Sequence, residues 1–238
     1  MKRIIIFLIA ILINCTAFAQ THKIASYVIG SGGGIIQNSS NVVKGTTGQP
    51  AIGLLSNTSN FAMFGFWYLL PNEVIQQISL TTGWNMVSLY VEPKNISMES
   101  VWANIVNKVL IVKNNQGAVY IPSYNINNIG NWNKIEGYLV YMTSAETLEV
   151  KGKKIKPSTT VINLNTGWAI IPYLRSSNMT PALSFKTLTD EDALLIAKDL
   201  LGNAFIPQYN IDNLGNLVPG KAYKIYISKN GSQLIYPD

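Results

Sequence analysis

Cysteine and histidine are almost absent from this sequence. Its 238 residues contain one of each, Cys15 and His22. Cys15 lies in an apolar leader, so the rest of the chain can form neither an internal disulfide nor a thiolate metal site. A single histidine in an N-terminal tail cannot be positioned as a catalytic base. We therefore expect no metal site built from Cys or His, no cofactor and no enzymatic activity, with a fold held by packing and hydrogen bonds alone.

Charged residues are also scarce, at 13% against 47% hydrophobic residues. Without Lys2 and Arg3 of the leader, 16 basic and 12 acidic residues remain, a net charge of 16 − 12 = +4. The only basic run is Lys151–Lys156, which is interpreted either as a solvated turn or as a contact for phosphate or anionic glycan. It contains no aromatic residue, so nucleic acid is not an expected partner.

Only one long apolar run is present, and it is N-terminal. Lys2-Arg3, the apolar stretch Ile4–Ile13 and the cleavage motif Ala17-Phe18-Ala19 form a secretory signal peptide over residues 1–19. A lipoprotein reading of Leu12–Cys15 is less suitable because Asn14 occupies a position that requires a small residue. We expect export to the cell surface or exterior, with the periplasm as an alternative, and no transmembrane segment.

Residues 20–77 are expected to be a β-rich segment followed by a linker. Short apolar runs separated by Gly and Asn clusters indicate hairpins. The expected pieces are a strand at Ser26–Gly30, a break at Ser31–Gly34, apolar pairs near Val42-Val43 and Ile52–Leu55, a turn over Gly45–Pro50, a strand from Phe61 to Leu70, and a linker over Pro71–Gln77.

Three motifs in this segment carry a resemblance. They are Gly32-Gly-Gly34, Gly45-Thr-Thr-Gly-Gln-Pro50 and Gly65-Phe-Trp67. Together they resemble a lead-in found in exported proteins of Bacteroidota-like Gram-negative bacteria. The resemblance implies a lineage and a compartment and implies no activity.

The rest of the chain contains an internal repeat. Ile78–Ser88 returns as Ile162–Pro172, and Leu110–Asn131 aligns with Leu195–Asn216 with 12 identities in 22 positions. A period of 84 to 85 residues is too long for a solenoid unit and indicates duplicated small domains. We predict two tandem modules, 78–158 and 159–238. Each is a small β-sandwich or partly open barrel with one short helix, so the fold class is mainly β.

Local signals place the elements of each module. Ser97 is a suitable N-cap for a helix with an apolar stripe at Met98, Val101, Trp102 and Ile105, and Thr180-Pro181 begins its counterpart. Hairpins are expected over Val109–Ile121 and Leu194–Ile206. Later strands are expected at Gly137–Met142 and Ala222–Ile227, with last strands at Thr147–Val150 and Gln233–Tyr236.

The module also resembles a unit that is widespread in bacterial and archaeal surface proteins. Gly83-Trp-Asn85 and Glu136-Gly-Tyr138 carry this resemblance, and the second module departs from it at Ala169 and at Lys221-Ala-Tyr223. The resemblance implies extracellular display, attachment or assembly, and it brings no catalytic residues.

Candidate binding residues surround one repeated polar loop, Tyr124–Asn131 and its twin Tyr209–Asn216. Asn residues form left-handed turns, and side-chain oxygens at alternate positions can bind calcium, so turn formation, sugar or peptide contact and calcium binding are all open. Trp84 and Trp168 recur and are expected in the core. Trp132 has no partner tryptophan and is expected either to pack or to stack on a ligand. The candidate ligand-binding residues are Trp132, Tyr124, Tyr209, Asn125, Asn210 and Asp212.

These observations predict a secreted, non-enzymatic protein that serves adhesion or assembly, as part of a matrix, filament or surface complex. Its partners would be proteins or polysaccharides at the cell surface, including further copies of itself. A carbohydrate-binding module is the alternative, and a carboxylate-only hydrolase the third hypothesis. The acidic cluster Asp190-Glu-Asp192 is adjacent in sequence, so its carboxylates cannot face one another across a scissile bond, and it is interpreted as a solvated turn.

Overall fold

The computed structural model describes residues 32–37, 42–47, 53–56, 61–64 and 73–238, with side chains described for 73–238. The chain divides into two compact units, Met1–Pro71 and Asn72–Asp238. Among the described residues no helix is both long and apolar enough to cross a membrane. The predicted signal peptide, the predicted strand Ser26–Gly30 and the motif Gly65-Phe-Trp67 lie outside the described residues.

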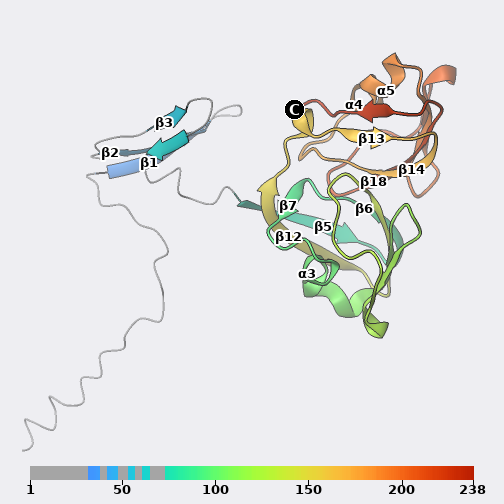
Figure 1. The fold of residues 1–238 in the computed structure, drawn as a ribbon, viewed down its shortest axis with the longest axis horizontal. Helices are drawn as coiled ribbons and strands as arrows, with labels where there is room; N and C mark the ends of the chain where they lie inside the picture. Colours follow the sequence, from blue (N-terminus) through green and yellow to red (C-terminus); the bar gives the residue numbers. More distant parts are fainter. Residues whose placement is uncertain (1–31, 38–41, 48–52, 57–60, 65–72) are drawn as a thin grey trace, which may run out of the picture. The chain divides into compact units, whose positions relative to one another are not determined.

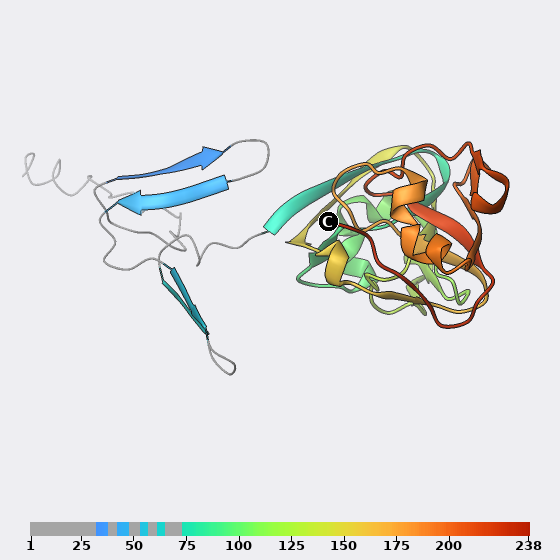
Figure 2. The ribbon, with the colours of Figure 1, turned by 90° about the horizontal axis from the view of Figure 1, so that it is seen from above.

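Two antiparallel hairpins are described in the first unit. Strand β1 (Gly32–Gln37) pairs with β2 (Val42–Thr47), and β3 (Gly53–Ser56) pairs with β4 (Phe61–Phe64) (Figure 2). Two expectations are corrected here. The glycine triplet begins β1 instead of ending a strand, and Gly45–Thr47 continues β2 instead of forming a turn, because the glycines are paired across the ladder.

The strands of the second unit form two β-sandwich-like groups, which we call the first half (strands within Glu73–Lys154) and the second half (strands within Ile162–Leu234) (Figure 1). In the first half a five-stranded sheet has the order β10-β9-β8-β11-β6 and a three-stranded sheet the order β5-β12-β7. The strands are β5 (Glu73–Leu80), β6 (Gly83–Val87), β7 (Val91–Pro93), β8 (Val109–Lys113), β9 (Val119–Ile121), β10 (Ile126–Asn127), β11 (Tyr138–Met142) and β12 (Glu146–Lys154).

The second half has a five-stranded sheet whose order, β17-β16-β15-β18-β14, matches that of the first half strand by strand, and a two-stranded sheet, β13-β19. The expected hairpins and later strands are found in both halves. The strands are β13 (Ile162–Leu164), β14 (Gly167–Pro172), β15 (Leu194–Lys198), β16 (Ala204–Ile206), β17 (Ile211–Asp212), β18 (Ala222–Ile227) and β19 (Ser232–Leu234). The chain is therefore mainly β, as the sequence predicts.

Short helices follow the first strands of each half. Helix α3 (Met98–Val101) begins at Ser97, whose Oγ accepts a hydrogen bond from Ser100 N at 3.2 Å. All four residues of the predicted stripe are buried, and the helix continues as the 3-10 turn η1 (Ala103–Lys108). In the second half, α4 (Pro181–Ser184) begins at Pro181 and α5 (Lys186–Asp190) follows. The remaining 3-10 turns are η2 (Pro122–Tyr124), η3 (Pro157–Thr159) and η4 (Pro207–Tyr209).

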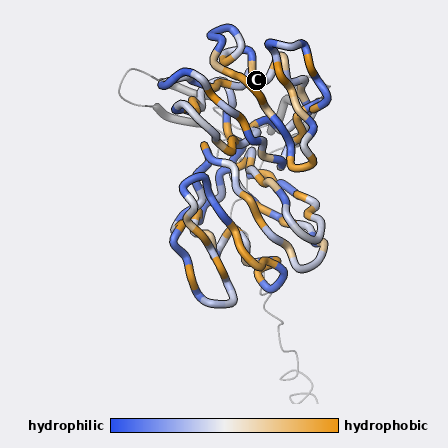
Figure 3. Tube along the Cα trace, turned by 90° about the vertical axis from the view of Figure 1, so that its right-hand side faces the viewer, coloured by the Kyte–Doolittle hydropathy of each residue, from blue (hydrophilic) through white to orange (hydrophobic). Residues whose placement is uncertain are grey.

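Each half has its own hydrophobic cluster. The tube in Figure 3 shows hydrophobic residues recurring along the strands of both halves. Phe185, Leu188 and Tyr236 are among the fully buried residues of the second cluster, and Val87, Met98 and Trp102 of the first. Burial of this apolar area supplies the stabilisation that disulfides supply in small disulfide-rich domains.

Two boundaries differ from the sequence prediction. Residues 73–77, expected in a linker, belong to β5, which pairs with β12 along its whole length from Glu73 opposite Lys153 to Leu80 opposite Glu146. The basic run Lys151–Lys156 was interpreted as a turn, but its residues up to Lys154 belong to β12. Lys151 forms an ion pair with Glu73 on the neighbouring strand at 3.2 Å. Along β12, exposed Glu149, Lys151 and Lys153 alternate with buried Val150 and Gly152, the pattern of a half-buried strand.

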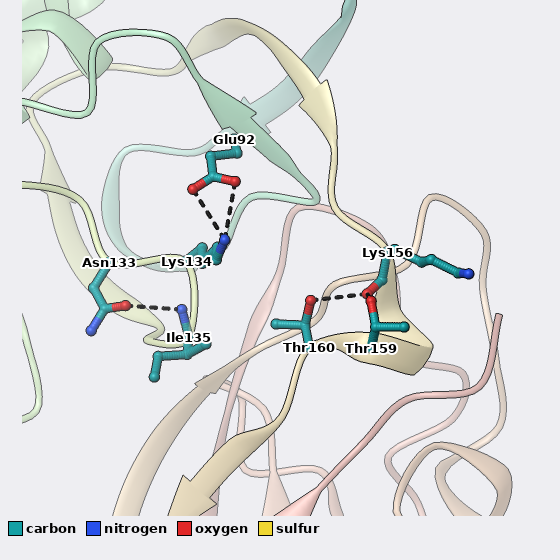
Figure 4. Close-up of polar contacts among 7 residues, drawn as sticks. All are labelled: Glu92, Asn133, Lys134, Ile135, Lys156, Thr159 and Thr160. Carbon is teal, nitrogen blue, oxygen red and sulfur yellow. Dashed lines mark hydrogen bonds and ion pairs between the residues drawn. The ribbon is translucent and has the colours of Figure 1, made fainter. Parts of the chain in front are cut away.

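Two polar turns shape the region where the halves meet (Figure 4). Between the halves, the hydroxyls of Thr159 and Thr160 donate to the carbonyl of Lys156 at 3.3 and 2.9 Å, which closes η3. Before β11, Asn133 Oδ1 accepts from Ile135 N at 3.2 Å, and Lys134 pairs with Glu92 at 3.0 Å. The second turn sets the position of Glu136 and Gly137.

The halves join through the edges of β6 and β14. Gly137 N donates to Ile170 O at 3.0 Å, and a methyl group on Gly137 would lie 2.7 Å from the Cβ of Ala222. On the other side, Ser88 N donates to Gly220 O at 3.0 Å and Ser88 Oγ to Lys221 O at 2.6 Å. Each half therefore covers part of the outer edge of the first sheet strand of the other, at Ile170 of β14 and at the Val87–Ser88 end of β6.

A pair of buried tyrosines occupies equivalent positions. The hydroxyl of Tyr138 accepts from Asn133 N, and that of Tyr223 from Val218 N, both at 2.8 Å. Burial raises the pKa of each phenol to about 12, because the phenolate would lose its hydration.

These tyrosines predict alkaline destabilisation. Their folded-state pKa of about 12 lies above the ordinary value of 10.0, so their stabilisation is complete below pH 10 and is lost as pH rises through 12. Urea unfolding at a series of pH values is expected to show the free energy of unfolding falling across that window. The double variant Tyr138→Phe/Tyr223→Phe should have a shallower fall, and an unfolding free energy that stays constant for the natural chain would contradict the assignment.

Candidate functional site

The repeated tryptophans are on the surface, which corrects the expectation that they are core residues. Trp84 is 39% exposed and Trp168 is 49% exposed. Each indole stands edge-on to a tyrosine of the neighbouring strand, with centroids 5.2 Å apart in both pairs, Trp84–Tyr141 and Trp168–Tyr226. Val87 and Val140 face inward instead, so β6 and β11 carry apolar side chains on both faces while only one face is covered.

The exposed face of the first sheet carries a continuous row of large apolar side chains. Trp84 lies opposite Tyr141, Tyr141 opposite Ile111, and Ile121 opposite Ile126. Val112 pairs with Tyr120 and both are buried, so the adjacent Ile111 and Ile121 face outward side by side. We call this set the first row: Trp84, Tyr141, Ile111, Ile121 and Ile126.

The second sheet carries the same five residue types in the same order. Trp168 lies opposite Tyr226, Tyr226 opposite Ile196, and Ile206 opposite Ile211. Ala197 pairs with the buried Phe205, which again leaves the residues before and after them outward. We call this set the second row: Trp168, Tyr226, Ile196, Ile206 and Ile211. Every member of both rows is half-buried or exposed.

Lysines lie beside the tryptophan of each row. The Nζ of Lys113 is 5.4 Å from the ring centroid of Trp84, and those of Lys198 and Lys224 are each 4.9 Å from that of Trp168. Cation–π contacts of this kind contribute about 0.5–1 kcal/mol at exposed sites. Within residues 73–238 the ion pairs involve other lysines, so the amines beside the rows form no ion pair there that a partner would have to displace.

Trp132 is not available to a ligand. It is 4% exposed and packs against Tyr138 at 4.2 Å and Trp102 at 6.3 Å, between ring centroids. The expectation that it stacks on a sugar or protein is therefore wrong, and the packing alternative is correct. Trp132 N and Ile96 O are hydrogen-bonded at 2.6 Å, which fixes the residue beneath the loop that was expected to expose it. Leu217, its counterpart, is also fully buried.

The candidate tyrosines are the most accessible of the predicted residues. Tyr124 is 75% exposed and Tyr209 is 73% exposed, each at the end of a 3-10 turn. Asn125 and Asn210 follow them in left-handed conformation, with φ of 54° and 53°. Each asparagine directly precedes the isoleucine that ends its row, so the predicted loop adjoins the observed apolar surface.

The polar loop is a turn held by its own asparagine. Asn127 Oδ1 accepts from Gly130 N at 2.7 Å, and its Nδ2 donates to Gly130 O at 3.0 Å and to Glu99 Oε1 at 2.7 Å. These bonds use the oxygen that calcium would need, which favours the turn-forming interpretation. Asp212 replaces Asn127 in the second half and is exposed. Within the part of the chain described, no three His, Cys, Asp or Glu side chains gather as a metal site.

The acidic cluster also behaves as surface. Asp190, Glu191 and Asp192 are exposed, and Asp190 forms an ion pair with Lys186 at 2.7 Å at the end of α5. Its carboxylates do not converge on a cavity, in agreement with the interpretation as a solvated turn.

The rows escaped sequence reasoning because their strands have apolar residues on both faces. Such a pattern is typical of a strand buried between layers, and periodicity alone cannot say which face is open. One signal was present. Ile111, Ile121, Ile126 and Tyr141 are identical to Ile196, Ile206, Ile211 and Tyr226, together with Trp84 and Trp168.

Comparisons with known proteins add no relative. Neither the scan against protein-family models nor the searches of curated proteins and of solved structures found a match for this chain.

The burial of Trp132 is testable by unfolding. Trp132→Ala is expected to lower the free energy of unfolding by about 3–5 kcal/mol, because it leaves a cavity beside Trp102 and Tyr138. Trp132→Leu, which copies Leu217, should cost less. Trp84→Ala is the surface control, with a cost of about 1 kcal/mol. Equal losses for Trp84→Ala and Trp132→Ala in urea would show that the two indoles have similar surroundings.

Proposed function

We propose that the chain is an exported, non-enzymatic protein that serves adhesion or assembly at the cell surface, and that it contacts protein partners through its two rows. The observation that carries the proposal is the repetition of one exposed row on two sheets. The core explains why buried positions match between the halves. It does not explain why five outward positions also match, whereas a shared contact surface does.

The composition of the rows favours a protein partner. Three isoleucines cross each sheet and offer no hydrogen bonds to sugar hydroxyls, while their branched side chains and the Trp–Tyr pair present a flat apolar strip. Interfaces are enriched in aromatic residues at such central strips and polar at the rim. The lysines beside each tryptophan supply the rim and favour a partner with acidic residues there.

Self-association and adhesion of the purified full-length mature chain test this proposal. The variant Ile126→Ser/Ile211→Ser should weaken both by about tenfold or more, because it breaks both rows at solvent-exposed positions without touching the cores. Sedimentation over a concentration series measures self-association, and retention of labelled protein on whole Gram-negative cells measures adhesion. Leu201→Ser is the matched control, since Leu201 is exposed and lies outside the rows.

Two results would contradict the proposal. One is unchanged sedimentation and cell retention in the row variant. The other is an equal loss in the Leu201→Ser control, which would show that any exposed apolar residue suffices.

Carbohydrate binding by the loops is a second candidate function, favoured by the exposure of Tyr124 and Tyr209 beside asparagines. Exposed tyrosines stack on the apolar faces of sugar rings. If the loops bind glycans, Tyr124→Ala/Tyr209→Ala should abolish retention on a glycan array, while Ile126→Ser/Ile211→Ser leaves it unchanged. An array signal that is insensitive to both tyrosines would exclude this role for the loops.

A further inference from the structure

A polar groove of about 320 Å³ lies beside Trp168, where the halves meet. Its walls come from the β13–β14 turn of the second half and from two turns of the first half. We call it the Trp168 groove. The polar side chains along it that the following argument uses are Gln116, Glu136, Asn163, Asn165 and Thr166.

An asparagine that closes a turn in the first half has no counterpart at the groove. In the first half Asn85 closes the turn before β6: its Nδ2 donates to Thr81 O at 2.8 Å and to Gly83 O at 3.0 Å, and its Oδ1 accepts from Thr81 N at 3.0 Å. Ala169 stands at the equivalent position in the second half and lines the groove. The carboxamide that fills the turn in one half is thus replaced by open space in the other.

The missing carboxamide leaves polar groups unengaged. Asn165 and Thr166 are exposed, and within residues 73–238 their side chains have no hydrogen-bond partner. In the first half, the counterpart of Asn165 is Thr81, which donates to the side chain of Asn85. Asn115 also borders the groove, but it is committed to the backbone of Ile170, donating at 2.9 Å and accepting at 2.6 Å. It acts as a fixed wall.

A carboxylate is held in place on the opposite wall. Glu136 Oε1 accepts from Asn133 Nδ2 at 3.2 Å and from Gln116 Nε2 at 3.5 Å. Both donors come from turns of the first half, so the acceptor is oriented before any ligand arrives. Pre-orientation of this kind reduces the entropy that binding costs.

We propose that the Trp168 groove binds a saccharide. The indole of Trp168 is 49% exposed and offers apolar surface beside the amines of Lys198 and Lys224 for the C–H side of a sugar ring. Amide, hydroxyl and carboxylate groups along the groove offer both donors and acceptors for the sugar hydroxyls. A peptide strand would need a row of free backbone groups, and here the backbone of Ile170 is already bonded to Asn115 and Gly137. The amines of Lys198 and Lys224 beside the indole extend the site toward acidic sugars.

The inference deepens the proposed adhesive role and rests on it: the rows contact protein, and this groove gives the same surface protein a contact to glycan. It also distinguishes the halves, because the side chain of Asn85 occupies the turn beside Trp84, whereas Ala169 stands at the equivalent position beside Trp168.

The test is a titration of the full-length mature chain with saccharides, in which NMR spectra monitor the indole N–H signals of its tryptophans. Neutral probes are cellobiose, maltose and lactose, and acidic probes are digalacturonate and a sulfated disaccharide. We expect the Trp168 signal to shift at millimolar concentration with at least one probe. The neutral and acidic arms report whether Lys198 and Lys224 contribute.

Three variants locate the site. Binding by the variants is measured by isothermal titration calorimetry, because Trp168→Ala removes the indole signal. Trp168→Ala should weaken binding by about tenfold or more, and Asn165→Ala by about threefold to tenfold. Ala169→Asn should also abolish binding, because it restores the carboxamide that closes the turn in the first half, and unchanged thermal unfolding would show that the fold is kept. Trp84→Ala is the matched control and should bind as the natural chain does.

Absence of a shift at Trp168 with all five probes overturns the inference, as does undiminished binding by Ala169→Asn. Neither result affects the protein-binding rows, because the Ile126→Ser/Ile211→Ser experiment leaves the groove intact. Conversely, if the variant Ile126→Ser/Ile211→Ser keeps its protein contacts and still binds saccharide, the protein-contact proposal fails while the groove proposal stands.

Discussion

The mutual covering of two strand edges organises the folded unit. In each five-stranded sheet one edge strand, β6 or β14, would leave backbone donors and acceptors unpaired, and unpaired buried groups of this kind are costly. Gly137 and Asn115 bond to Ile170 on one side, while Ser88 bonds to Gly220 and Lys221 on the other. The contact requires glycine at position 137, because a methyl group there would meet Ala222 and Ile170 at less than 3 Å.

This junction also fixes where the candidate sites lie. Trp84 and Trp168 stand on the edge strands that take part in the contact, so both rows begin near it and run outward across their sheets to Ile126 and Ile211. The same turns that hold the edge of β14 supply Gln116 and Glu136 to the Trp168 groove. Packing between the halves and the placement of polar side chains therefore depend on one set of hydrogen bonds.

Local structure was readable from the sequence wherever one physical rule dominated. Ser97 and Pro181 mark helix starts because capping and proline geometry act within a few residues. The hairpins followed from glycine and asparagine at the turns. The placement of Glu73–Gln77 in β5 was missed because pairing with β12 is a contact across more than 70 residues, and no local pattern reports it.

The candidate site was harder to predict, for two different reasons. Tyr124 and Tyr209 were found because a polar loop with an aromatic residue is a local feature, and their exposure agrees with it. Trp84 and Trp168 were expected in the core but lie on the surface, and of the two alternatives for Trp132 the packing one is correct. Hydrophobicity gives a preference for burial but does not tell which side of a sheet tertiary packing covers. The groove depends on a difference between halves, Asn85 against Ala169, whose meaning appears only when the turn is seen in space.

The halves differ where a shared design is free to change. Trp132 and Leu217 fill equivalent core positions with different volumes, which neighbouring side chains can accommodate. Leu139 in the first half corresponds to Lys224 in the second, so a single substitution adds an amine beside Trp168. The rows retain their residue types while these surroundings vary, so a contact common to both halves and a specialised one in the second can coexist.

Exposed apolar rows carry a risk of uncontrolled strand addition, and the sheet edges show how this risk is limited. The outer edge strands β10 and β17 are two residues long, and β6 and β14 are covered at the junction. A foreign strand therefore finds little free backbone on either five-stranded sheet. What these sheets offer to a partner is the outward face with its side chains, whose identity can be selective in a way that backbone pairing cannot. Recognition by side chains on a face, with short or partly covered edges, would allow a partner to bind without polymerisation through the strands.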